Sequence, residues 1–112
     1  MSECLFCQII AGEVPATIVK RSPHGIAFLD INPQAPTHVV IAPRQHLATL
    51  NDTSDARLLG QLLLLAREVA EGEGLQARGY RVVVNTNRDA GQSVFHLHLH
   101  VLGGRTMAWP PG

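Results

Sequence analysis

The strongest pattern in the chain is an alternation of histidine with leucine near its C-terminal end. His96, His98 and His100 occupy every second position, and Leu97 and Leu99 lie between them. Successive side chains of a β-strand leave opposite faces, so residues two positions apart share a face. The pattern therefore predicts one strand that carries three imidazoles on one face and packs its leucines into a core on the other.

Weaker periodicities predict the remaining elements. Apolar residues recur at spacings of three and four from Leu58 to Val69, which predicts an amphipathic helix that ends near Glu71, before the helix breakers Gly72 and Gly74. The other expected elements are a short helix and four strands, and they cover residues 5–11, 17–22, 25–30, 38–42 and 81–86.

Composition and charge narrow the class of protein. A chain of 112 residues with 46% hydrophobic content is expected to form one domain over residues 1–112. No apolar run reaches the roughly 18 residues that a membrane span requires. Nine Lys and Arg balance nine Asp and Glu and are scattered along the chain, which argues against a nucleic-acid-binding surface built on charge. The first residues lack the features of a secretory signal, so we expect a cytoplasmic protein.

The histidine array is the first candidate for chemistry. Because a strand advances about 3.3 Å per residue, His96 and His100 would lie on the order of 13 Å apart at Cα, too far to share one zinc ion easily. Two neighbours could share a metal, or the middle imidazole could react while its neighbours orient it. The preceding turn, Gly91-Gln92-Ser93, offers backbone N–H groups and a hydroxyl, which suit phosphate oxygens.

A second candidate cluster begins with Cys4 and Cys7. A C-x-x-C pair is compatible with a redox couple, with half of a zinc site, or with two small buried residues. A redox site of the thioredoxin type would follow a strand, and no strand is expected there. A zinc site would need two more ligands, for which His46 and His96 are candidates.

Taken together, these segments resemble the histidine triad (HIT) nucleotide hydrolases and transferases. The resemblance rests on His96-x-His98-x-His100-Val101-Leu102 and on the preceding Gly91-Gln92-Ser93-Val94. The ending, Gly103-Gly104-Arg105 followed by Met107-x-Trp109-Pro110-Pro111-Gly112, is similar to the Hint branch of that family. The likeness runs from Phe6 to the last residue.

The resemblance implies a fold and an assembly. The fold would be α+β, with an antiparallel sheet of about five strands, one long helix and one short helix per subunit. The short links between the expected strands agree with this, because they have the length of hairpins rather than of parallel crossovers. The assembly would be a homodimer, with the tail 103–112 at the interface.

The resemblance also implies roles for individual residues. His98 would be the nucleophile, supported by His96, His100 and His38, and Ser93 would assist the leaving group. The implied nucleotide-binding set is Phe6, Ile9, Phe28 and Ile31 at the base, Asp30 at the ribose, and Asn85, Gly91, Gln92, Ser93, Val94, His98 and His100 around the phosphate.

For the second cluster, some relatives hold a structural zinc through two cysteines and two histidines. The matching residues here are Cys4, Cys7, His46 and His96. Many Hint proteins lack the cysteines, so the resemblance leaves a structural zinc open. A His96 ring that binds zinc would not also be a free hydrogen-bond partner for the other histidines.

The reaction that the resemblance implies is hydrolysis of purine nucleoside 5′-phosphoramidates to AMP or GMP and an amine, through a phosphohistidine. The nine acidic residues show no paired arrangement that would hold magnesium, which favours a neutral histidine nucleophile and no cofactor for catalysis. The alternatives are a dinucleoside polyphosphate hydrolase, a nucleotide-binding or scaffold protein without turnover, and a redox protein that uses the two cysteines.

Overall fold

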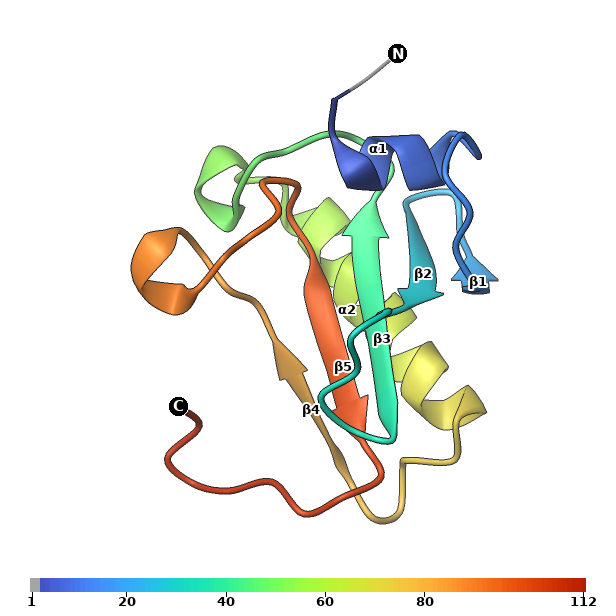
Figure 1. Ribbon diagram of the computed structural model, residues 1–112, viewed down its shortest axis with the longest axis vertical. Coiled ribbons are helices and arrows are strands. Elements are labelled where there is room, and N and C mark those ends of the chain that lie inside the picture. Colours follow the sequence, from blue (N-terminus) through green and yellow to red (C-terminus); the bar gives the residue numbers. More distant parts are fainter. Residues whose placement is uncertain (1–2) are drawn as a thin grey trace.

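The computed structural model describes residues 3–112, and Figure 1 shows how its helices and strands are arranged. Two short 3₁₀ turns, η1 and η2, lie in its longer loops. The elements in chain order are α1 (Leu5–Ile10), β1 (Ile18–Arg21), β2 (Gly25–Leu29), β3 (Thr37–Pro43), η1 (Leu50–Asp52), α2 (Ala56–Gly72), β4 (Tyr80–Val83), η2 (Arg88–Ala90) and β5 (Leu99–Gly103).

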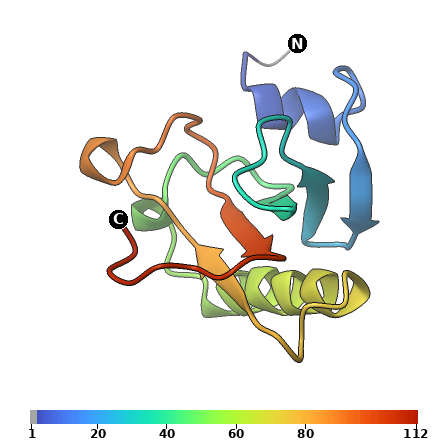
Figure 2. The same ribbon diagram turned by 60° about the horizontal axis from the view of Figure 1, so that its bottom comes forward.

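The five strands form one sheet in the order β1-β2-β3-β5-β4. Every neighbouring pair is antiparallel, and the central pair aligns Thr37 of β3 with Gly103 of β5. Helix α2 covers one face of the sheet, and α1 lies on the opposite side (Figure 2). The predicted α+β fold with a five-stranded antiparallel sheet, one long helix and one short helix is therefore confirmed.

Alternate residues of β3 belong to two separate apolar clusters. Val39 and Ile41 pack with the buried face of α2, whereas Val40 packs with Phe6 of α1. Because side chains alternate along a strand, His38 shares the α1 side with Val40. The strand therefore uses one face for the core and the other for the functional cavity described below.

The long helix follows the sequence pattern closely. Asp55 is its N-cap, and the Asp55 carboxylate accepts a hydrogen bond of 3.0 Å from the Leu58 amide. Leu58, Leu62 and Leu65 are buried at the expected spacing of three and four. The helix ends at Gly72, one residue beyond the predicted end.

Two strands differ from the prediction at positions that carry candidate site residues. β5 begins at Leu99, so His96 and His98 precede the regular strand. The amide of Leu97 donates to the carbonyl of Leu47 at 2.6 Å, which ties this segment to a loop rather than to β3. β4 ends at Val83, so Asn85 lies in the following loop rather than at the end of the strand.

Among residues 3–112, no helix combines the length and the apolar character that a bilayer crossing needs.

Candidate active site

A cavity of about 450 Å³ opens on the α1 side of the sheet. Its size falls in the range of small-molecule sites. All residues expected to bind nucleotide line it, whereas His96 does not. The lining residues are Leu5, Phe6, Ile9, Val14, Pro15, Ala16, Phe28, Leu29, Asp30, Ile31, Asn32, Gln34, His38, Val40, Asn85, Gly91, Gln92, Ser93, Val94, His98 and His100.

Two of the cavity histidines form a hydrogen-bonded relay that starts at a backbone amide. The amide of Gln34 donates to His38 Nδ1 at 3.0 Å, so this nitrogen carries a lone pair. His38 Nε2 then carries the proton and donates to His100 Nδ1 at 2.8 Å. In the neutral relay, the remaining proton of His100 is on Nε2, the ring atom that is free to act as a donor in the cavity.

His98 has the opposite arrangement. Its Nδ1 donates to the backbone carbonyl of His96 at 2.7 Å, because a carbonyl oxygen can only accept. The neutral ring therefore keeps its lone pair on Nε2. Phe6 and His100 both approach the His98 ring edge-on, with centroid distances of 4.9 Å, and they limit its rotation. The arrangement presents an oriented, unprotonated nitrogen to the cavity.

The turn before the histidines is held from inside by Gln92. The Gln92 side-chain amide donates to the carbonyls of Ala48 and Val94 at 2.8 and 3.1 Å, and its oxygen accepts from the amide of Asn87 at 2.9 Å. The backbone amide of Gln92 also donates to Asn87, at 3.1 Å. The donors of Gln92 are thus engaged within the protein, so the expected contact from Gln92 to a phosphate would require breaking one of these bonds.

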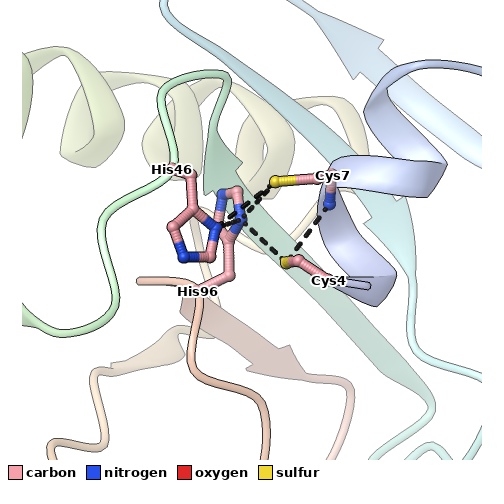
Figure 3. A group of neighbouring side chains, drawn as sticks. All are labelled: Cys4, Cys7, His46 and His96. Carbon is pink, nitrogen blue, oxygen red and sulfur yellow. Dashed lines mark hydrogen bonds between the residues drawn. The ribbon is translucent and has the colours of Figure 1, made fainter. Parts of the chain in front are cut away.

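The predicted metal ligands come together beside α1 (Figure 3). The ligand atoms of Cys4, Cys7, His46 and His96 all lie within 4.8 Å of one another. His96 Nδ1 lies 3.3 and 3.5 Å from the sulfurs of Cys4 and Cys7, and 3.2 Å from His46 Nδ1. A tetrahedral zinc ion with ordinary bond lengths separates two nitrogens by about 3.3 Å and a nitrogen from a sulfur by about 3.5 Å. The donor set therefore fits zinc.

The hydrogen bonds around His96 support the same fit. Its Nε2 donates to the Pro43 carbonyl at 2.8 Å, which leaves the lone pair on Nδ1, facing the cysteines. The backbone carbonyl of His96, rather than its ring, serves His98. The conflict between zinc binding and support of the other histidines, expected from the sequence, therefore does not arise.

A second group of metal-ligand residue types consists of Asp30, His38 and His100. Asp30 Oδ2 lies 3.4 Å from His38 Nε2. That nitrogen carries a proton, however, because the Gln34 amide occupies the lone pair on the other ring nitrogen. Metal binding there would break the relay, so this group suits hydrogen bonding rather than metal coordination.

Comparison with known proteins identifies the family that has this arrangement of residues. Residues 11–107 match the model of the HIT domain family. The chain belongs to the HIT family. The chain is 45% identical to the purine nucleoside phosphoramidase of Escherichia coli (strain K12), over 94% of this chain and 90% of that protein.

Two solved HIT structures extend the comparison. A HIT family hydrolase from Legionella pneumophila Philadelphia 1 superposes with a TM-score of 0.95 and 53% identity, covering 98% of this chain and all of that chain (100%). A zinc-bound histidine triad family protein from Mycobacterium smegmatis superposes with a TM-score of 0.84 and 31% identity, covering 92% and 76% of the two chains.

Burial sets the charge state of the HIT histidines. Desolvation lowers the pKa of His38, His96 and His98 below the usual 6.5. For His100, burial together with the neighbouring His98 and His38 lowers the pKa to about 4, although the negative charge of Asp30 acts in the opposite direction. The relay and the nucleophile candidate are therefore neutral near pH 7, the state that the hydrogen bonds require.

Sequence reasoning missed part of this HIT site. Val14, Pro15 and Ala16, in the link after α1, complete the apolar wall, and no motif marks them. Gln34 was also missed, because its contribution to the relay is a backbone amide that any residue could supply. Val40 could have been found, since it lies two positions after His38 on the same strand face.

Proposed function

We propose that this chain hydrolyses purine nucleoside 5′-phosphoramidates, with His98 as the nucleophile. The observation that carries the proposal is the His98 ring, whose Nδ1–H is bonded to the His96 carbonyl and whose Nε2 lone pair is left for a substrate in the cavity. A neutral imidazole is a good nucleophile toward phosphorus. The name of the E. coli relative, purine nucleoside phosphoramidase, supports the substrate class.

The proposed reaction has two displacements. His98 Nε2 attacks the α-phosphorus, the P–N bond to the amine breaks, and the amine nitrogen takes a proton from solvent through the Ser93 hydroxyl. Water then attacks the nucleotidyl-histidine, the new P–N bond breaks, and a nucleoside monophosphate leaves. The sum consumes one phosphoramidate and one water, and it yields one monophosphate and one amine.

The surrounding residues would stabilise the charge that develops on the phosphate. The backbone amides of Ser93 and Val94 and the Nε2–H of His100 are the donors we assign to its oxygens. We give Gln92 a different role from the one first expected: its engaged donors support holding the turn rather than touching the phosphate. Asp30 would accept from the ribose hydroxyls.

The base would lie against the apolar wall. Phe6 and Phe28 meet edge-to-face with a centroid distance of 5.2 Å, and Ile9 is buried beside Phe6. Ile31 is 98% exposed at the mouth of the cavity, where a bound base would cover it. Apolar walls recognise purines by contact area and distinguish adenine from guanine only weakly.

We further propose that zinc binds Cys4, Cys7, His46 and His96 and that it takes no part in the chemical step. A bound zinc would crosslink the start of α1 to the segment before β5. His96 does not line the cavity, which supports a structural rather than a catalytic role for the metal. The crosslink would fix Phe6, which contacts the ring of His98.

We also propose that the protein is a homodimer. β4 is the last strand of the sheet, and its outer edge has no partner strand among residues 3–112. Tyr80 on β4 is 36% exposed, and Leu63 and Leu64 on α2 are 55% and 47% exposed. An open strand edge with exposed apolar residues favours association with a second copy. Trp109, in the tail, is 82% exposed and could contribute to the same interface.

The first experiment is release of AMP from adenosine 5′-phosphoramidate in the presence of EDTA. We expect turnover by the wild type, and its loss in His98→Ala with AMP affinity retained. His24→Ala, at a histidine outside the cavity, is the matched control. A wild type without turnover would contradict the proposal, and assays with dinucleoside polyphosphates and nucleotide-binding measurements would then separate the alternatives.

A further inference from the structure

The tail that follows β5 contacts the loop between β2 and β3 at one end of the sheet (Figure 1). Arg105 makes this contact with two atoms of its guanidinium group. Its Nε and Nη2 both donate to the carbonyl of Gln34, at 3.1 and 3.0 Å. Its Nη1 donates to the carbonyl of Thr106 at 3.1 Å, which fixes the direction of the group. Two charge-assisted bonds to one carbonyl hold that peptide firmly.

Close packing at the neighbouring position supports the same contact. Gly104 has a φ of +90°, and a Cβ added there would lie 2.9 Å from Cβ of Pro36. Glycine thus lets the tail approach the loop closely. The tail contact therefore combines packing at Gly104 with hydrogen bonding at Arg105.

The other side of residue 34 faces the active site. The Gln34 amide donates to His38 Nδ1 at 3.0 Å and is the first donor of the relay to His100. The position of this amide depends on the position of residue 34, which Arg105 holds through the adjacent carbonyl. Within the loop, the Gln34 side chain also donates to the carbonyl of Asn32 at 3.0 Å. Arg105 itself does not line the active-site cavity.

We propose that Arg105 is a positioning residue for catalysis: it holds Gln34 so that the Gln34 amide fixes the ring orientation and the unprotonated Nδ1 of His38. Through His38, the contact also orients His100, whose Nε2–H faces the cavity. This inference rests on the proposed function for its effect on turnover. The structural part, which concerns the His38 ring alone, does not depend on any activity.

A consequence for protonation follows from the geometry. An N–H donor that points at Nδ1 opposes the arrival of a proton there, because two donors would face each other. The other groups that face His38 are His100 on β5 and Asp30 in the loop after β2, with His98 next to His100. Release of Gln34 removes only the opposing donor. The pKa of His38, which burial lowers in the wild type, should then rise towards 6.5.

The test is nuclear magnetic resonance of the imidazole nitrogens in ¹⁵N-histidine-labelled protein, recorded against pH for the wild type, Arg105→Ala, Arg105→Lys and Arg81→Ala. Arg81 is the matched control, because its Nη2 also donates to a tail carbonyl, that of Ala108 at 2.8 Å, but it does not contact Gln34. Arg105 lies on the surface, so its substitutions are expected to leave the fold intact.

We expect Arg105→Ala to alter the His38 Nδ1 signal and to raise the pH at which His38 takes up a proton. Arg105→Lys keeps the charge but supplies a single compact donor group. It should therefore change the His38 Nδ1 signal and the pH of His38 protonation less than Arg105→Ala does. For the proposed reaction, Arg105→Ala should lower kcat by about tenfold with KM changed less than about twofold, and move the acid limb of the rate profile to higher pH.

Two results would overturn the proposal. One is an unchanged His38 titration in Arg105→Ala; the other is an equal change in Arg81→Ala, which would mean that any loosening of the tail has the same effect. A wild type without phosphoramidase turnover would overturn the proposed function but would leave the His38 titration as an intact test of the positioning role.

Discussion

Acid should destabilise this protein through the neutral histidines that lie wholly or partly buried in the fold, and His100 provides the sharpest test. Its pKa is lowered to about 4 in the folded protein, against 6.5 for an ordinary histidine. Between these values, the unfolded chain binds a proton on this residue and the folded protein does not. Stability therefore falls as the pH drops from about 7 towards 4.

The magnitude follows from the two pKa values. At pH 5, the unfolded state gains about 2 kcal/mol from protonation of this one imidazole, and the full difference below pH 4 is about 3 kcal/mol. Because His100 is partly rather than fully buried, these figures are upper estimates. A loss of about 2 kcal/mol is a large part of the stability of a small domain.

The assay compares urea unfolding at pH 7.5 and pH 5 for the wild type and His100→Gln. Glutamine has no titrating group, and its amide oxygen can still accept from His38. We expect the wild type to lose up to about 2 kcal/mol more than the variant between the two pH values. His24→Gln, in the turn between β1 and β2, measures the general effect of replacing one histidine. Equal losses in the wild type and His100→Gln would refute the reasoning.

Three further predictions concern other parts of the molecule. Gln92→Leu removes a buried amide that bridges three backbone segments, so unfolding free energy should fall by about 1–3 kcal/mol in urea titrations, and a stability equal to that of the wild type would contradict this. Gly25→Ala would bring a Cβ to 2.9 Å from the Ala42 carbonyl oxygen and should cost about 1–3 kcal/mol by the same measurement, whereas Gly60→Ala, with open space around it, is the control. Cys7→Ser should reduce bound zinc, measured by elemental analysis of untagged protein, from about one equivalent to a small fraction and should lower Tm; a zinc-free wild type would contradict the metal site.

Much of the fold could be predicted from local patterns in the sequence. The spacing of Leu58, Leu62 and Leu65 predicts α2 because a helix with one buried face needs apolar residues every three to four positions. The short links from β1 to β2 and from β2 to β3 agree with the antiparallel sheet that the family resemblance implies. The ends of the strands were harder to predict. His96 and His98 lie outside β5, and the Leu97 amide between them bonds to a loop that is distant in the sequence. A hydrogen bond between two backbone groups cannot be predicted from residue identity, because almost any residue can form it.

The sequence by itself determined which chemical groups are available: alternating histidines, the turn Gly91-Gln92-Ser93 before them, and two cysteines three positions apart. These groups depend only on residue identity and on spacing along the chain, both of which the amino-acid sequence contains. The tertiary structure alone decided which nitrogen of each ring carries a proton. The protonated nitrogen is fixed by the Gln34 amide in His38, by the His96 carbonyl in His98, and by the Pro43 carbonyl in His96. Each of these partners is a backbone group, so its position comes from the folding of the chain and not from the identity of the residue that supplies it.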